Sequence, residues 1–191
     1  MTAIVGLVQD GEVWMGADSA GVYPSYEMTI TKHPKVFRVG GMLIGFTSSW
    51  RMGQILQYGL PGFQALDSVI HEPYAQADAF VTVCTTFIEW CRDVFKAAGY
   101  ATKEKYAEIG GQFLVGYRGR LFKVESDYSV GEAAIGFDAI GCGALPALGS
   151  LYTSRLSGGP EYRIEKALMA AEKFSAGVRS PFTILKLEKA A

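Results

Sequence analysis

The sequence has 191 residues, of which 49% are hydrophobic and 19% charged, with a formal net charge of −1. These values are typical of one globular domain with a sizeable core, and they exclude a disordered chain. Because Lys and Arg are scattered along the chain, we expect no nucleic-acid partner and no anionic membrane surface. No apolar run reaches the roughly 18 residues that a membrane span needs, and no secretory signal is recognisable at the N-terminus.

Two hairpins are expected in the first half of the chain. Asp10-Gly11 and Gly40-Gly41 are each flanked by apolar runs, and residues of these types accept the positive φ that tight hairpin turns require. A polar stretch from Asp18 to Pro34 joins the two hairpins. The strands expected around the turns are residues 3–8, 13–17, 35–39 and 42–46.

Two helices are expected after the hairpins. The first runs from Ser49 to about Tyr58, with Ser48 or Ser49 as its cap. The second begins after Asp78 and ends at about residue 98, whereas residues 59–77 between the two helices give no clear pattern. One face of the second helix carries apolar residues at helical spacing, namely Phe80, Val83, Cys84, Phe87, Trp90, Cys91, Val94 and Phe95.

The second half repeats this order of strands and helices. Arg118-Gly119 predicts a third hairpin. The expected strands are residues 112–117, 121–124, 134–141 and 182–187, and the expected helices are residues 144–154 and 161–176. Antiparallel sheets with amphipathic helices pack most economically as two sheets face to face with the helices outside. We therefore predict an α+β fold, a four-layer αββα sandwich, formed by a single domain of residues 1–191.

The cysteines and histidines argue against metal chemistry. Cys84, Cys91 and Cys142 have neither the pattern of a disulfide framework nor the paired spacing of zinc ligands, and a reducing, cytoplasmic location is the simplest interpretation. Cys84 and Cys91 lie seven residues apart on the apolar helix face and are expected in the core. His33 and His71 are too isolated for a histidine-based metal centre. We expect no metal and no cofactor.

The candidate for chemistry is the second residue of the chain. The sequence contains no nucleophile elbow, phosphate-binding loop, dinucleotide-binding glycine pattern or zinc-peptidase helix motif. Thr2 is small, so we expect a methionine aminopeptidase to remove Met1 and free the α-amine of Thr2. With an unperturbed pKa of about 7.7–8.0, such an amine can accept the proton of the hydroxyl on the same residue. A buried lysine beside an aspartate would supply a positive field that favours this step.

Six segments, taken in order, resemble one known family. They are TAIVG (2–6), GADSAG (16–21), KVFRV (35–39), IGFTSS (44–49), AIGCGA (139–144) and FTIL (182–185). Together they resemble the proteasome β-subunits and the bacterial HslV-type ring peptidases, which belong to the N-terminal nucleophile hydrolase superfamily. The resemblance spans nearly the whole chain and is weakest from about residue 59 to residue 110.

The resemblance implies a threonine-type endopeptidase and assigns residues to its site. It implies that Thr2, Asp18 and Lys35 are catalytic, that the amide of Ser48 binds the oxyanion, and that Cys142 supports them. Substrate binding is implied for Gly21, Val22, Phe46 and Ser49, with Phe46 and its neighbours favouring an apolar side chain and His33 lying near the same pocket. The implied substrates are peptides or unfolded proteins. The implied assembly is a homo-oligomer of stacked rings gated by an ATPase unfoldase.

Some positions depart from the family pattern. Cys142 stands where the family has a serine near the threonine amine, and a thiol is the weaker hydrogen-bond partner. The family's aspartate and serine near the end of the last helix have no clear counterpart among Phe174, Ser175 and Val178. Ser48 replaces a glycine but keeps the backbone N–H that an oxyanion hole needs.

Several alternatives stay open from the sequence. Asp18 could orient a turn, Lys35 could be an edge-strand charge, Ser48 could be only a helix cap, and Cys142 could be a small packed residue. If Met1 is retained, the chain could be a silent subunit of a ring. A third alternative is an amidase that acts on a small amide.

Overall fold

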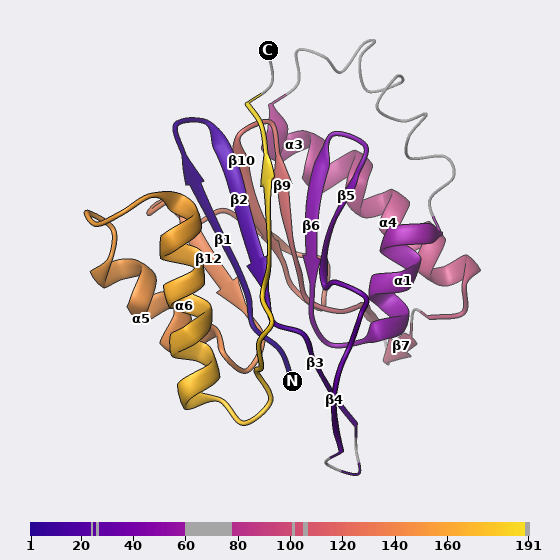
Figure 1. The fold of residues 1–191 in the computed structure, drawn as a ribbon. Coiled ribbons are helices and arrows are strands. Elements are labelled where there is room, and N and C mark those ends of the chain that lie inside the picture. Colours follow the sequence, from indigo (N-terminus) through magenta and orange to yellow (C-terminus); the bar gives the residue numbers. More distant parts are fainter. Residues whose placement is uncertain (24, 26, 60–77, 101, 105–106, 190–191) are drawn as a thin grey trace.

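Two antiparallel sheets lie face to face and carry helices on their outer sides (Figure 1). The computed structural model describes residues 1–23, 25, 27–59, 78–100, 102–104 and 107–189. The first sheet has the order β12-β1-β2-β13, with β1 (Ile4–Gln9), β2 (Glu12–Ala17), β12 (Phe137–Ile140) and β13 (Thr183–Leu187). The second sheet has the order β11-β10-β9-β6-β5, with β5 (Val36–Val39), β6 (Met42–Phe46), β9 (Phe113–Tyr117), β10 (Arg120–Val124) and β11 (Val130–Gly131).

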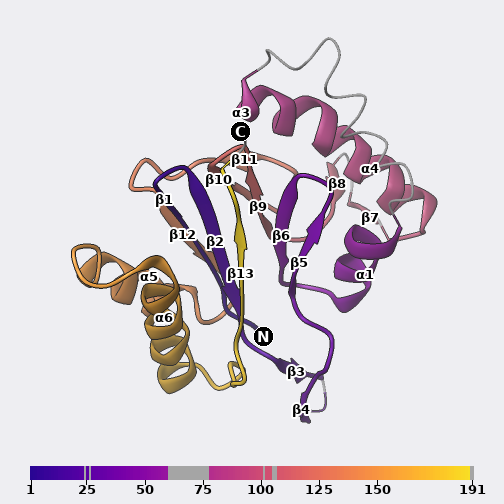
Figure 2. The ribbon, with the colours of Figure 1, turned by 45° about the horizontal axis from the view of Figure 1, so that its top comes forward.

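The helices cover the two outer faces. The first sheet is covered by α5 (Ala144–Thr153) and α6 (Pro160–Phe174). The second is covered by α1 (Trp50–Tyr58) and by a long helix made of α3 (Ala79–Thr82), one π-helical turn (Val83–Phe87) and α4 (Ile88–Ala97). The turned view in Figure 2 shows the same two helical layers on opposite sides of the sheets. The predicted four-layer αββα sandwich is therefore confirmed.

Three apolar layers hold the four structural layers together. Alternate residues of a strand point to opposite faces of its sheet. Thus Ile4 packs between the two sheets, whereas Val5 packs against the helices α5 and α6. The middle layer is formed by Ile4, Val13, Met15, Ala17, Val36, Leu43, Leu114, Leu121 and Ile140. A larger aromatic layer between the second sheet and its helices includes Phe87, Phe95, Phe113 and Phe122.

The predicted hairpin turns are confirmed by their backbone geometry. Asp10 and Gly11 have φ angles of 55° and 79°, and Arg118 and Gly119 have φ angles of 47° and 73°. These turns fix the register of β1 on β2 and of β9 on β10. The register matters for the site because it pairs Ile4 with Ala17. The next residues outside this pair, Ala3 and Asp18, therefore lie side by side.

Some elements differ from the sequence predictions. The polar stretch 18–34 contains a short hairpin of β3 (Ala20–Val22) and β4 (Met28–Ile30), and a second one of β7 (Thr102–Glu104) and β8 (Ala107–Ile109) follows α4. Cys91 is buried as expected, but Cys84 is only half-buried. Residues seven apart share a face in a regular α-helix, and the wider π-helical turn that contains Cys84 breaks this spacing. His71 lies outside the described residues.

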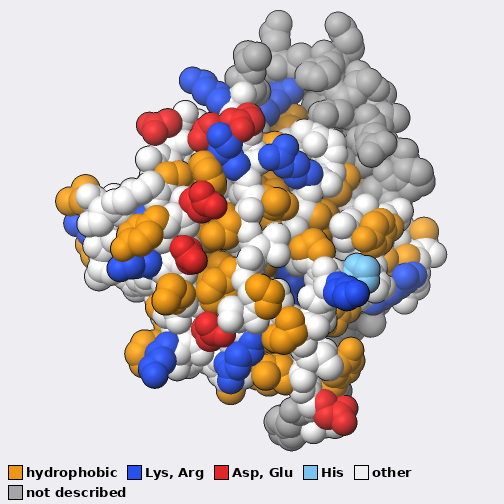
Figure 3. Space-filling view, viewed as in Figure 1, with side chains coloured by type: hydrophobic (Ala, Val, Ile, Leu, Met, Phe, Trp, Pro, Cys, Tyr) orange, Lys and Arg blue, Asp and Glu red, His pale blue; other side chains and the backbone are white. Residues whose placement is uncertain are grey.

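The surface shows no concentrated charge on the face seen in Figure 3. Acidic and basic side chains are interspersed there with apolar ones. None of the helices in the described ranges is long and apolar enough to span a lipid bilayer.

Candidate functional site

The structure brings together Thr2, Asp18 and Lys35, which are far apart in the sequence. Thr2 precedes β1 and Asp18 follows β2, so the pairing of these two strands places both residues at the same edge of the first sheet. Lys35 precedes β5 in the second sheet, and its carbonyl accepts a hydrogen bond from the amide of Phe46 at 3.0 Å. The lysine side chain therefore crosses from one sheet to the other at the end of the sandwich where the N-terminus lies.

The Asp18 carboxylate is buried and fully hydrogen-bonded. Its side chain accepts bonds from the backbone amides of Ala3 (3.0 Å), Ala20 (2.9 Å) and Arg179 (3.3 Å). The Nζ of Lys35 donates to the same carboxylate at 2.7 Å. These donors fix the orientation of the Asp18 carboxylate, and the carboxylate in turn orients the lysine side chain.

Lys35 is almost completely buried, with 2% of its surface exposed. Its Nζ donates to Oγ1 of Thr2 at 2.9 Å and lies 5.8 Å from the centre of the Trp50 ring. Burial lowers the pKa of Lys35, and the neighbouring Asp18 opposes that shift. Lys35 therefore presents an ammonium group to the threonine hydroxyl, in a setting where it releases a proton more readily than a surface lysine does.

The backbone around Thr2 is held by the segment that follows β12. The amide of Thr2 donates to Sγ of Cys142 at 3.3 Å, and the amide of Gly143 donates to the carbonyl of Thr2 at 3.2 Å. Gly141 has a φ of +90°, and a Cβ at this residue would lie 2.2 Å from the Thr2 carbonyl oxygen. Only glycine allows this approach. The hydroxyl of Thr2 itself donates to the carbonyl of Met1 at 2.5 Å.

Thr2 and Lys35 open into a small cavity of about 50 Å³, which we call the nucleophile cavity. It is lined by Met1, Thr2, Val22, Lys35, Phe46, Thr47, Ser48, Ser49 and Trp50. Four residues expected to bind substrate or oxyanion thus lie beside Thr2: Val22, Phe46, Ser48 and Ser49. Gly21 is not among the described lining residues, because it is buried on β3, where it pairs with Thr29.

Ser48 and Ser49 have separate structural roles. Ser49 caps α1, and its side chain accepts bonds from the amides of Arg51 and Met52. Ser48 has a φ of 74°, and its hydroxyl accepts a bond from the amide of Gln112 at 3.2 Å. The amide of Ser48 donates no hydrogen bond to any residue in the described ranges. A backbone N–H without an internal partner, beside a cavity that holds a hydroxyl, is suited to bind an oxyanion.

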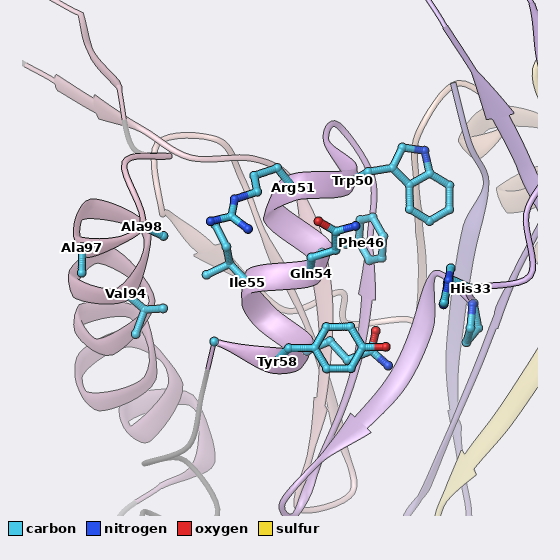
Figure 4. Close-up of a pocket in the computed structure, with 14 residues that line it drawn as sticks. His33, Phe46, Trp50, Arg51, Gln54, Ile55, Tyr58, Val94, Ala97 and Ala98 are labelled. Carbon is cyan, nitrogen blue, oxygen red and sulfur yellow. The ribbon is translucent and has the colours of Figure 1, made fainter.

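A larger cavity of about 650 Å³, which we call the α1 cavity, shares Phe46 and Trp50 with the nucleophile cavity. Figure 4 shows the residues that line the α1 cavity. It extends along α1 toward Val94, Ala97 and Ala98 of α4 and its end. His33, which the resemblance places near the substrate pocket, is one of its lining residues. No three His, Cys, Asp or Glu side chains in the described parts of the chain lie close enough together to hold a metal ion.

Three contributors to the site were missed by sequence reasoning. Thr47 and Trp50 line the nucleophile cavity, and Arg179 binds Asp18 through its backbone. The sequence did contain a signal for Trp50, because it is a large aromatic residue directly after the Ser49 cap. A backbone contact from a residue so far along the chain leaves no signal in the sequence. The hydroxyl of Ser175, the residue that follows α6, donates to the Cys142 carbonyl at 3.2 Å.

Comparisons with known proteins support the architecture. No protein-family model matches the sequence, and no curated protein matches it. Among solved structures, the chain is similar to BPH of Thiobacillus denitrificans in complex with epoxomicin, with a TM-score of 0.76, 20% identity and coverage of 100% of both chains. A second structure of that BPH gives a TM-score of 0.75, with 20% identity and 99% of each chain covered. Eukaryotic HslV from Trypanosoma brucei gives a TM-score of 0.70 and 16% identity, covering 98% of this chain and 99% of its own.

These similarities extend over the full length of the chain at low identity. The chain therefore has the fold of these solved structures, which agrees with the four-layer αββα sandwich predicted from the sequence.

Proposed function

We propose that this chain is a threonine-type peptidase whose nucleophile is Oγ1 of Thr2 once Met1 has been removed. The observation that carries the proposal is the buried ammonium of Lys35, which donates to Thr2 Oγ1 at 2.9 Å and to Asp18 at 2.7 Å. Burying a lysine is costly, because burial penalises its charged form. Its placement at a hydroxyl supports a role in activating that hydroxyl.

The proposed acylation step uses the amine of Thr2 as its base. Oγ1 attacks the substrate carbonyl carbon, and the free α-amine takes the hydroxyl proton. The oxyanion that forms is bound by the amide of Ser48. When the intermediate collapses, the C–N bond breaks and the α-ammonium protonates the leaving amine, which leaves an ester on Thr2.

Deacylation uses the same groups. Water attacks the ester carbonyl while the α-amine accepts its proton, and the ester bond breaks to restore the threonine hydroxyl. Lys35 provides a positive charge that disfavours protonation of the amine at rest, and Asp18 fixes the lysine in place. Cys142, 3.3 Å from the Thr2 nitrogen, holds that nitrogen toward the cavity.

Peptides or unfolded proteins are the proposed substrates, bound as an extended strand along Val22 and Ser48–Ser49. By analogy with HslV, the proposed assembly is a homo-oligomeric ring, stacked and served by an ATPase unfoldase. Sedimentation of the purified protein tests the assembly: a species of many subunits is expected, and a monomer at all concentrations would contradict it.

The experiment that tests the chemistry combines intact mass with active-site labelling. Loss of the Met1 mass is expected, followed by a single adduct on Thr2 when the protein is treated with a peptide vinyl sulfone that ends in alanine. The Thr2→Ala variant is the control and should remain unlabelled. Epoxomicin, the compound bound in the similar Thiobacillus denitrificans structure, is a second probe.

A second candidate is a silent ring subunit. The hydroxyl of Thr2 donates to the Met1 carbonyl, so a retained methionine occupies both reactive groups of Thr2. Retained Met1 together with an unlabelled Thr2 would support this candidate and would exclude peptidase activity. The third alternative, an amidase, predicts turnover of a compact amide while unfolded protein stays uncut.

A further inference from the structure

Two aromatic side chains separate the nucleophile cavity from the α1 cavity. Phe46 and Trp50 are the lining residues that the two cavities share among the described residues. Their rings meet edge to face, with centroids 5.5 Å apart and planes at 77°. On one side of this wall lie Thr2 and Lys35 in about 50 Å³, and on the other side lies a space of about 650 Å³.

Phe46 is a fixed part of this wall. It is 4% exposed, and its ring fills the place where a side chain at residue 53 would begin. A Cβ at Gly53 would lie 2.2 Å from Cζ of Phe46, so the ring is seated directly against α1. Trp50, in contrast, is only half-buried. The size of the opening between the cavities therefore depends on Trp50.

The position of Trp50 is set by the first turn of α1. It follows the Ser49 cap directly, and Figure 4 shows Trp50 and Arg51 leaving this turn in opposite directions. The indole is directed toward Lys35, whose Nζ lies 5.8 Å from the ring centre. Its Nε1 lies 3.7 Å from where a Cβ of Gly21 would be. Trp50 thus occupies space beside the nucleophile that a substrate side chain would otherwise enter.

Resting on the proposed function, we propose that Trp50 limits the size of the substrate residue on the acyl side of the cleaved bond. A site for one water molecule needs about 10–15 Å³ of such cavity volume, so the cavity of about 50 Å³ has room for only a small side chain while Met1 is in place. Removal of Met1 widens this cavity where Met1 lies against Gly177, but it leaves Phe46 and Trp50 in place. The wild-type chain therefore cleaves after small residues such as alanine.

The substitution Trp50→Ala joins the two cavities and should admit large side chains. The assay uses two fluorogenic peptide amides that differ only in having Ala or Phe before the cleaved bond. For the wild type, kcat/KM is expected to favour Ala by about tenfold or more, and Trp50→Ala should raise the Phe-to-Ala ratio by about tenfold or more. Trp90→Ala is the matched control: this tryptophan stacks on Phe87 and lines neither cavity, so the ratio should stay at its wild-type value.

The conservative variant Trp50→Phe provides the test if Trp50→Ala fails to fold. It keeps an aromatic ring beside Phe46 and should give an intermediate ratio. A wild type that prefers Phe, or a ratio unchanged in both Trp50 variants, would overturn the size limit. In that case labelling of Thr2 by the alanine-ended vinyl sulfone would show that the proposed function still stands. Absence of both labelling and cleavage in all variants would instead overturn the proposed function, and the size limit with it.

Discussion

Replacing Lys35 and replacing Asp18, the two partners of a buried ion pair, should each destabilise the protein, but by different amounts. Breaking a buried ion pair by deleting one partner costs about 3–5 kcal/mol, because a charge is left without compensation. In Lys35→Met, the Asp18 carboxylate keeps its backbone donors at Ala3, Ala20 and Arg179. The free energy of unfolding should therefore fall by about 3 kcal/mol, near the lower end of that range.

Asp18→Asn should be more damaging. It leaves the Lys35 ammonium buried with Thr2 Oγ1 as its remaining polar partner in the described structure, and it turns an amide NH₂ toward backbone N–H groups that need an acceptor. We expect a loss of about 5 kcal/mol for this variant. The double variant Lys35→Met/Asp18→Asn should also lose about 5 kcal/mol, rather than the sum of the two single losses, about 8 kcal/mol. The two effects do not add, because each substitution removes the charge that the other would leave buried without a partner.

Urea denaturation at pH 7 and a fixed protein concentration measures these differences through the free energy of unfolding. For a chain of this size the expected fall in Tm is about 6–12 °C for Lys35→Met and about 10–20 °C for Asp18→Asn. Glu89→Gln is the control, since its partner Arg92 is 37% exposed and Glu89 is 63% exposed; its loss should be below about 1 kcal/mol. A loss of less than about 1 kcal/mol for Lys35→Met, or equal losses for the two buried variants, would refute the reasoning.

Three further predictions follow from the site. Because burial lowers the pKa of Lys35, the unfolded chain binds more protons than the folded one between that lowered pKa and the ordinary 10.5, so stability relative to Lys35→Met should rise with pH in this window; a difference that stays flat in urea denaturation as the pH approaches 10.5 would contradict this. Gly141→Ala should lower the free energy of unfolding by about 2 kcal/mol or more and impair labelling of Thr2, because its Cβ meets the Thr2 carbonyl and its φ is +90°; a variant as stable and as reactive as the wild type would argue against the close approach. In the folded protein, iodoacetamide should modify the exposed Cys142 first, since burial raises the pKa of the Cys84 and Cys91 thiols; peptide mass spectrometry would report the order, and earlier modification of Cys91 would refute it.

The sequence predicted the layers because turns and apolar alternation are local signals. Asp10-Gly11 and Arg118-Gly119 are chemically suited to hairpin turns, and the alternation around them places Ile4 and Val5 on opposite faces. The β3–β4 hairpin was missed because β4 (Met28–Ile30) is exposed along its whole length and therefore lacks an alternating pattern. The π-helical turn was missed because its residues suit a regular helix equally well.

The site was predictable only in part for a similar reason. The resemblance singled out Thr2, Asp18 and Lys35, and the structure brings them within hydrogen-bonding distance, while their catalytic role stays a prediction. Contacts made by backbone groups, such as the amide of Arg179 on Asp18, do not depend on residue type and leave no trace in a sequence. The wall formed by Phe46 and Trp50 depends on how two rings meet in space, which spacing along the chain does not specify.

The bond between Asp18 and the Arg179 amide joins residues 161 positions apart, and this affects how the protein matures. While the ribosome has released only the first hundred residues, β1 can pair with β2, but β12, β13 and Arg179 are still missing. Contacts between such distant segments form late, since closing long loops is slow. The Asp18 carboxylate therefore receives the hydrogen bond of the Arg179 amide only when almost the entire polypeptide has emerged. A half-made chain therefore contains Thr2, Asp18 and Lys35 without the complete set of hydrogen bonds that holds the candidate site.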